Sequence, residues 1–249
     1  MGSLGGVARI LVCAIGSLLL RLPSRLWSPT IRLDRAATIE LARVGFPLLL
    51  SGAFFAFLMA ADRSVIAVMM TKKDVGDFAL ASLLVNSLQF IPQSISMILF
   101  PKMAKEYGRS RSARGLRRYL LLNLAFNVLT IIPVSLALYF WVEPLVHRYF
   151  PAYTAGIPAA KIACLCSMAW IYMGVGSIIG VVNKMMPYLA AMVVALLLIW
   201  ALGCAFVSHG YGIEGAAWAR VIGTTFLCLF TIGYSWYLTT LDAVPTKGS

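Results

Sequence analysis

Six apolar segments alternate with short polar or basic segments along most of the chain. They cover about residues 44–70, 78–100, 119–141, 155–181, 184–206 and 213–238. Each is long enough to cross the hydrocarbon core of a bilayer, which takes roughly 20 helical residues. The pattern therefore predicts six transmembrane helices, which together form a six-helix unit over residues 44–238.

A shorter apolar segment, about residues 5–21, precedes these six and contains Arg9. It resembles the apolar core of a signal peptide in length, but no small-residue cleavage site followed by a soluble chain is evident. We expect it to span the membrane, with an interfacial helix or an uncleaved signal anchor as alternatives. Residues 22–43 are then a basic cytoplasmic linker. The predicted fold class is an all-α integral membrane protein, a bundle of six to seven transmembrane helices in a single membrane domain over residues 1–249.

The composition supports this fold class and restricts the chemistry. Apolar residues make up 61% of the chain and charged residues 12%, against about 45–50% and about 25% in soluble proteins. Mean hydropathy is +0.87. Nine acidic residues, two histidines and five cysteines without a CxxC pair offer no clustered general acids, nucleophiles or metal ligands. We therefore expect no enzyme active site, no metal and no cofactor.

The formal charge of +12 would indicate nucleic acid in a soluble protein, but in a membrane protein it commonly follows the positive-inside rule. With alternating spans, fourteen basic residues fall on one side: those of 21–43 and 101–118, plus Lys184 and Lys247. Only four fall on the other side: Arg9, Lys72, Lys73 and Arg148. The bias predicts a cytoplasmic C-terminus and needs no nucleic acid. The segment Lys102–Arg118 is also expected to contact anionic membrane lipids.

Four ionisable residues lie inside the predicted spans, namely Asp62, Arg63, Lys161 and Arg220. Each costs roughly 2.5–3.5 kcal/mol at the centre of a membrane helix, so it needs a partner charge, a wet cavity or the interface. The three cations come from different helices and fall in the outer half of the membrane. We expect Asp62 to pair with Lys161 or Arg220, and the alternative for Lys161 and Arg220 is snorkelling to the headgroups.

Two spans carry stripes of neutral polar residues on one helix face. Asn86, Gln89, Gln93 and Ser96 form the first stripe, and Asn123, Asn127 and Thr130 form the second. Amide side chains in membranes hold helices together, and they also hydrogen-bond sugar hydroxyls in a hydrated cavity. Both roles are consistent with the spacing.

A polar, net-positive cavity without catalytic groups suits a carrier of large anionic or sugar-bearing substrates. The predicted cavity residues are Arg63, Lys161, Arg220, Asn86, Gln89, Gln93, Asn123 and Asn127.

Several motifs resemble the polysaccharide-biosynthesis branch of the multidrug/oligosaccharidyl-lipid/polysaccharide exporter superfamily, the O-antigen-type flippases. These motifs are Gly45-Phe46-Pro47, Ala61-Asp62-Arg63, Asp74 to Ala81, Ile91-Pro92-Gln93, Leu99 to Gly108 and Gly210 to Arg220. The resemblance extends over about residues 40–240, and the spacing of the motifs is similar to that in the C-terminal lobe of that family.

The resemblance implies a fold of two six-helix lobes around a central cavity, of which this chain supplies one lobe plus a preceding helix. A missing N-terminal lobe would then come from a longer chain, a second chain or a second copy. It also implies translocation of lipid-linked oligosaccharide, with undecaprenyl-diphosphate-linked glycan as the expected substrate, across the bacterial inner membrane. Asp62 is the acid inside the spans that would couple transport to an ion gradient.

Besides a non-catalytic scaffold, two other functions remain open at this stage. One is a drug or metabolite exporter of the same superfamily, although basic cavity residues would repel cationic drugs. The other is an integral-membrane glycosyltransferase or ligase acting on lipid-linked glycan, which the scarcity of acids disfavours.

Overall fold

The computed structural model describes residues 35–110 and 112–241. The chain divides into two units, Met1–Arg43 and Val44–Ser249, and the architecture below is that of the second unit. The predicted helix over 5–21 lies outside the described residues. The described part is almost entirely helical and contains no strand, which confirms the all-α fold class.

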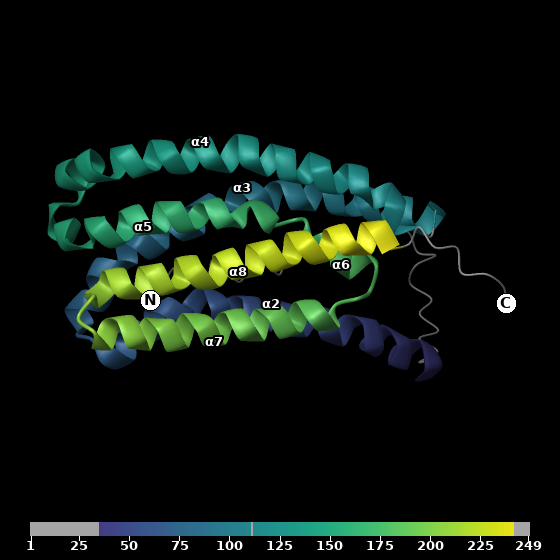
Figure 1. The fold of residues 1–249 in the computed structure, drawn as a ribbon, viewed down its shortest axis with the longest axis horizontal. Helices are drawn as coiled ribbons and strands as arrows, with labels where there is room; N and C mark the ends of the chain where they lie inside the picture. The colour runs from purple at the N-terminus through teal and green to yellow at the C-terminus, as the bar shows by residue number, and fades with distance from the viewer. Residues whose placement is uncertain (1–34, 111, 242–249) are drawn as a thin grey trace, which may run out of the picture. The chain divides into compact units, whose positions relative to one another are not determined.

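Six helical segments are long and apolar enough to cross a membrane, as the sequence predicted. The long helices are α2 (Arg35–Met69), α3 (Lys72–Ser110), α4 (Arg117–Tyr149), α7 (Met186–Ser208) and α8 (Gly212–Leu241). They run side by side and reverse direction at short turns (Figure 1). Helix α2 includes residues 35–43, whereas the sequence pattern predicts a linker there. Alanine, leucine, glutamate and arginine in this stretch all have high helix propensity.

The fourth span differs from the others because it is not one helix. It consists of the short helices η3 (Pro151–Gly156), α5 (Ile157–Met168), η4 (Ala169–Tyr172) and α6 (Gly176–Val181). This span and α8 are the most enclosed, with 56% of their most apolar stretch buried, against 18–28% in the other spans. The interior of the bundle therefore forms around α5 and α8, and α5 packs against α3, α4 and α8.

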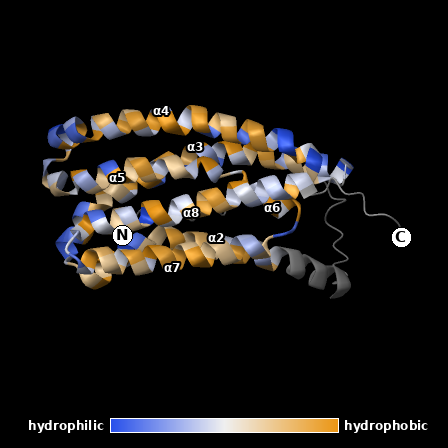
Figure 2. Cartoon of the chain, in the orientation of Figure 1, coloured by the Kyte–Doolittle hydropathy of each residue, from blue (hydrophilic) through white to orange (hydrophobic). Residues whose placement is uncertain are grey.

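Apolar side chains face both the interior and the outside of the bundle. Leu58, Ile66, Ile131, Trp170 and Ile199 are fully buried, while many large apolar side chains on the outer faces are exposed, including Leu49, Phe90, Leu129, Phe140 and Leu229. The middle of the helices is hydrophobic, and hydrophilic residues gather at their ends (Figure 2). An apolar outer surface between polar ends is what a bilayer requires of a protein that spans it.

Candidate functional site

The break in the fourth span lies between η4 and α6. Met173 adopts an extended conformation (φ −60°, ψ 136°), and Gly174 has φ +84°. The left-handed region is costly for residues other than glycine. A broken helix frees backbone carbonyl and amide groups, and inside a membrane these need protein or water partners.

Asn127 on α4 satisfies the freed carbonyls. Its side-chain amide donates to the carbonyl oxygens of Met173 at 3.0 Å and Ile171 at 3.3 Å, and also to Asn123 Oδ1 at 2.8 Å. Both asparagines are buried. The second polar stripe thus lies against the break, and its contacts are those of helix packing.

A groove of about 350 Å³ opens beside the break. Its walls come from α2, α3, the broken span and the start of α7. The lining combines hydroxyl and amide groups with aromatic rings and glycines: Ser51, Gly52, Phe55, Gln93, Ser96, Phe100, Tyr172, Gly174, Gly176, Ser177, Gly180 and Tyr188, together with three methionines. Tyr172 is 2% exposed, and its hydroxyl has no hydrogen-bond partner among the described residues.

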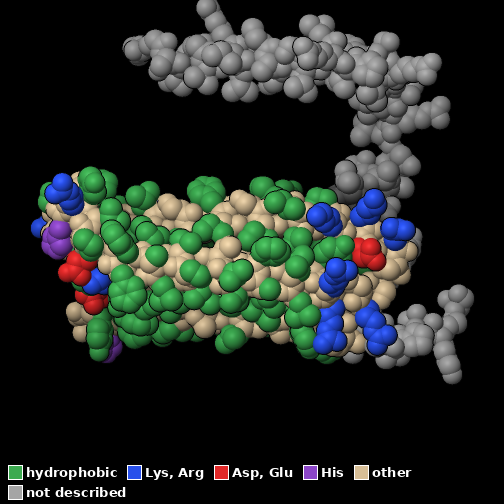
Figure 3. Space-filling view, turned by 90° about the horizontal axis from the view of Figure 1, so that it is seen from above, with side chains coloured by type: hydrophobic (Ala, Val, Ile, Leu, Met, Phe, Trp, Pro, Cys, Tyr) green, Lys and Arg blue, Asp and Glu red, His purple; other side chains and the backbone are tan. Residues whose placement is uncertain are grey.

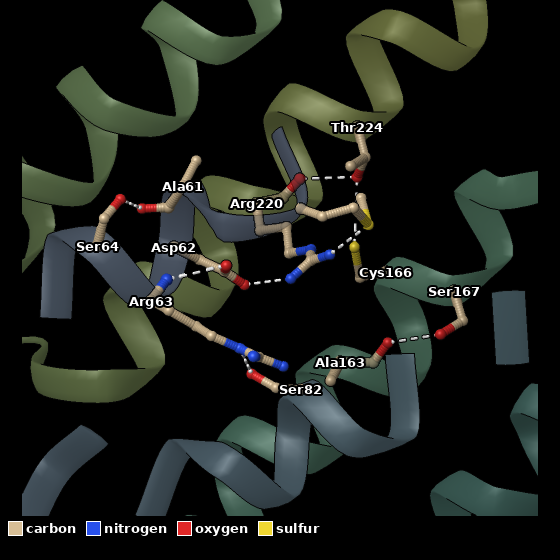
Figure 4. Close-up of polar contacts among 11 residues, drawn as sticks. Ala61, Asp62, Arg63, Ser64, Ser82, Ala163, Cys166, Ser167, Arg220 and Thr224 are labelled. Carbon is tan, nitrogen blue, oxygen red and sulfur yellow. Dashed lines mark hydrogen bonds and ion pairs between the residues drawn. The ribbon is translucent and has the colours of Figure 1, made fainter. Parts of the chain in front are cut away.

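A buried ion pair lies in the half of the bundle away from this groove. Arg220 on α8 donates from Nη1 to Oδ2 of Asp62 on α2, and the two side chains are 4% and 1% exposed. Arg220 Nη2 also contacts Met59 Sδ at 3.4 Å. Figure 4 shows the two side chains pointing toward one another, with Cys166 and Thr224 beside them. The expected partnership of Asp62 with Lys161 or Arg220 is thus resolved in favour of Arg220.

The other two intramembrane cations have different partners. Arg63 is exposed and donates from Nε to Ser82 Oγ at 2.8 Å; no ion pair forms with it among the described residues. Lys161 pairs with Glu143 of α4 at 2.5 Å, with the side chains 32% and 50% exposed. The predicted cations therefore occupy separate environments, and none of the three lines the groove.

Only part of the first polar stripe, Asn86, Gln89, Gln93 and Ser96, lines the groove. Gln93 and Ser96 line the groove. Asn86 is exposed, Gln89 is half-buried, and neither contributes to the groove lining. The sequence did not indicate the groove itself, because its walls come from separate helices. The helix break has one signal in the sequence, the pair Gly174 and Gly176 inside an apolar span.

Charged side chains gather at the two ends of the second unit and leave the middle apolar (Figure 3). One end contains the junction of α3, η2 (Ala113–Leu116) and α4, and the last turns of α8 also reach it, since Arg117 lies over the Trp236 ring at 4.5 Å. This basic end carries Lys102, Lys105, Arg109, Arg114, Arg117, Arg118 and Lys184. The opposite end has the α2–α3, α4–η3 and α7–α8 turns. The described residues hold no group of three histidine, cysteine or acidic side chains able to bind a metal.

Six membrane-length helices with an apolar surface between charged ends define a multi-pass membrane protein. The family model described as polysaccharide biosynthesis protein matches residues 7–152, more than half of the chain. The chain therefore belongs to this family, which confirms the polysaccharide-biosynthesis part of the resemblance and supports a role in polysaccharide assembly. No curated protein matches the chain, and no solved structure does.

Proposed function

We propose that this chain helps to translocate lipid-linked oligosaccharide across the bacterial inner membrane for the assembly of surface polysaccharide. In this function the glycan head crosses the bilayer through the protein while the polyprenyl tail stays in lipid. The transported molecule is chemically unchanged, so the function requires a path and a conformational cycle and no bond-making residue.

The observation that carries the proposal is the groove at the broken helix. A sugar-bearing head group has many hydroxyls, and moving it through hydrocarbon without replacing its hydration is costly. The groove supplies hydroxyl and amide groups from helices long and apolar enough to span a membrane, next to a segment where the backbone is not helical. Non-helical backbone inside a membrane is tolerated where it lines a cavity, and broken helices are typical of transporter binding sites.

The test is mass spectrometry of lipid extracts from the host with and without this chain. We expect complete lipid-linked oligosaccharide to accumulate when the chain is deleted, while polysaccharide at the cell surface is lost. A plasmid-borne copy should restore both to wild-type levels.

The same measurement separates the alternatives. Shortened or missing lipid-linked glycan would mean that the chain helps to build the substrate, and a glycosyltransferase or ligase function would replace the proposal. Unchanged glycan at the surface together with altered drug sensitivity would indicate an exporter of small molecules.

A further inference from the structure

The chemistry of the groove lining distinguishes between the two parts of a lipid-linked glycan, the sugars and the diphosphate. None of the described residues that line it is acidic, basic or histidine. Building on the proposed function, we propose that the groove binds uncharged sugar rings of the glycan head, with Gln93 and Tyr188 as specificity-determining residues, and that the diphosphate is held outside it.

The polar groups of the groove are neutral donors and acceptors. Gln93 brings an amide and Ser177 a hydroxyl, while Tyr172 and Tyr188 bring phenolic hydroxyls. Tyr172 lines the groove, and its hydroxyl is buried and has no hydrogen-bond partner among the described residues. A buried hydroxyl without a partner is destabilising by about 1–3 kcal/mol. A sugar hydroxyl bound against Tyr172, or a water in its place, would satisfy it.

The apolar part of the lining suits the C–H faces of a sugar ring, which carry no hydroxyl group. Phe55, Phe100, Tyr172 and Tyr188 bring aromatic rings to the groove, and the C–H faces of a pyranose pack on such rings. Gly52 and Gly180 leave room between them, since a Cβ at either position would meet nothing within 4 Å. Aromatic walls with a few placed polar groups are the usual composition of a small-molecule site.

The position of the groove in the bundle indicates where the diphosphate would lie when sugars occupy the groove. The groove residues on α3 lie in the half of that helix nearer the basic end, as do α6 and the start of α7, while those on α2 lie near the middle of that helix. Lys102 and Lys105 follow Phe100 within about two helical turns. A diphosphate inside the groove would have no counter-charge, whereas at the basic end it meets several. Sugars in the groove and phosphates at the basic end are therefore compatible in one loading position.

The first experiment measures binding with the full chain in lipid nanodiscs. The probe is the neutral glycan that mild acid releases from the host's lipid-linked precursor, and isothermal titration calorimetry follows its binding. Gly180→Leu places a side chain in open space within the groove. Gly233→Leu is the matched control, because Gly233 also faces nothing within 4 Å but lies on α8 outside the groove.

We expect the released glycan to bind wild-type protein and Gly233→Leu equally, and to bind Gly180→Leu at least tenfold more weakly. Gln93→Leu and Tyr188→Phe should each weaken binding several-fold, and excess inorganic pyrophosphate should not compete. Absence of glycan binding to the wild-type chain, equal binding to Gly180→Leu, or competition by pyrophosphate would each overturn the proposal. Displacement of the glycan by undecaprenol would overturn it in favour of a site for the lipid tail.

Failure of this proposal is separable from failure of the proposed function. If deletion causes lipid-linked glycan to accumulate while all groove variants bind glycan as wild type does, translocation stands and the groove assignment falls. If deletion leaves both lipid-linked and surface glycan unchanged, translocation falls, whatever the groove binds.

Discussion

Asp62 and Arg220 depend on each other in the bundle, because each neutralises a charge that would otherwise be buried alone. Removing one partner of a buried ion pair costs about 3–5 kcal/mol. We therefore expect Asp62→Asn and Arg220→Gln each to lower the unfolding temperature of the purified protein strongly, as measured by thermal denaturation in detergent. The double variant Asp62→Leu/Arg220→Met should recover most of the loss, since a well-packed apolar pair leaves no unpaired charge.

These variants also test Asp62 as the ion-coupling residue. If the single variants remain as stable and abundant as wild type but lose transport, the pair serves the transport cycle more than the fold. If the double variant is stable and still transports, Asp62 has no coupling role.

Arg63 is the intramembrane cation best placed to contact a substrate, because it is exposed and bonded to Ser82, a neutral residue. We expect Arg63→Gln to reduce surface polysaccharide while it changes stability by no more than about 0.5 kcal/mol, as exposed substitutions usually do. Immunoblotting of membranes together with quantification of surface glycan checks both parts. Lys161→Gln is the matched control, since Lys161 is paired with Glu143; an equal loss of glycan in both variants would contradict a specific role for Arg63.

At the residue scale the sequence predicted the need for partners better than their identity. The cost of Asp62 and Arg220 in hydrocarbon was enough to expect an ion pair, and the structure contains one. Lys161 was expected to pair with Asp62 or to snorkel, and its pairing with Glu143 was missed, because Glu143 lies on a different helix. Hydropathy gives the depth of a residue but not the direction in which it points.

At the scale of the element, the break in the fourth span depends on Gly174. Its φ of +84° lies in the left-handed region, which costs other residues about 1–2 kcal/mol. A Cβ there would also collide with Ser96 Oγ and Asn123 Nδ2. We expect Gly174→Ala to lower the unfolding temperature and to reduce transport, because the added Cβ would force a change in the turn that joins η4 to α6.

Gly180→Ala provides the contrast for this prediction, because Gly180 lies in α6 and a Cβ there meets nothing. Replacing a helical glycine with alanine stabilises by roughly 0.5–1 kcal/mol, so its unfolding temperature should rise slightly. Equal effects of the two substitutions would mean that the break is not maintained by Gly174.

The elements were predicted well where one helix crosses the membrane without interruption, and less well where it does not. Hydropathy over residues 155–181 is uniformly high, so the segment was predicted as a single span. The conformation of Gly174 depends on Asn123 and Asn127 of α4, and such a contact between distant residues leaves no trace in a hydropathy profile. The asparagine stripe was visible, but its role became clear only from the carbonyls it contacts.

At the scale of the whole molecule, the bundle was predictable because a membrane allows few folds, and helices satisfy their own backbone hydrogen bonds. The groove was not predictable, because Ser51, Gln93 and Tyr188 come from three helices whose facing sides depend on their mutual packing. The separation of charge was visible in the sequence as well as in the structure, since basic residues of distant loops gather at one end (Figure 3).

This charge separation predicts how the protein is oriented. The described basic end carries seven lysine and arginine residues, and the loops at the opposite end carry Lys72, Lys73 and Arg148. By the positive-inside rule we expect the basic end to face the cytoplasm. Under the proposed function, newly made lipid-linked glycan would then enter the groove from that side. In a cysteine-free background, a membrane-impermeant maleimide should label Tyr149→Cys and Tyr211→Cys in intact spheroplasts, because both positions are exposed at the opposite end. Gly108→Cys, an open position at the basic end, should react only after the membrane is disrupted. The reverse labelling pattern would place the groove on the outer side and rule out loading from the cytoplasm.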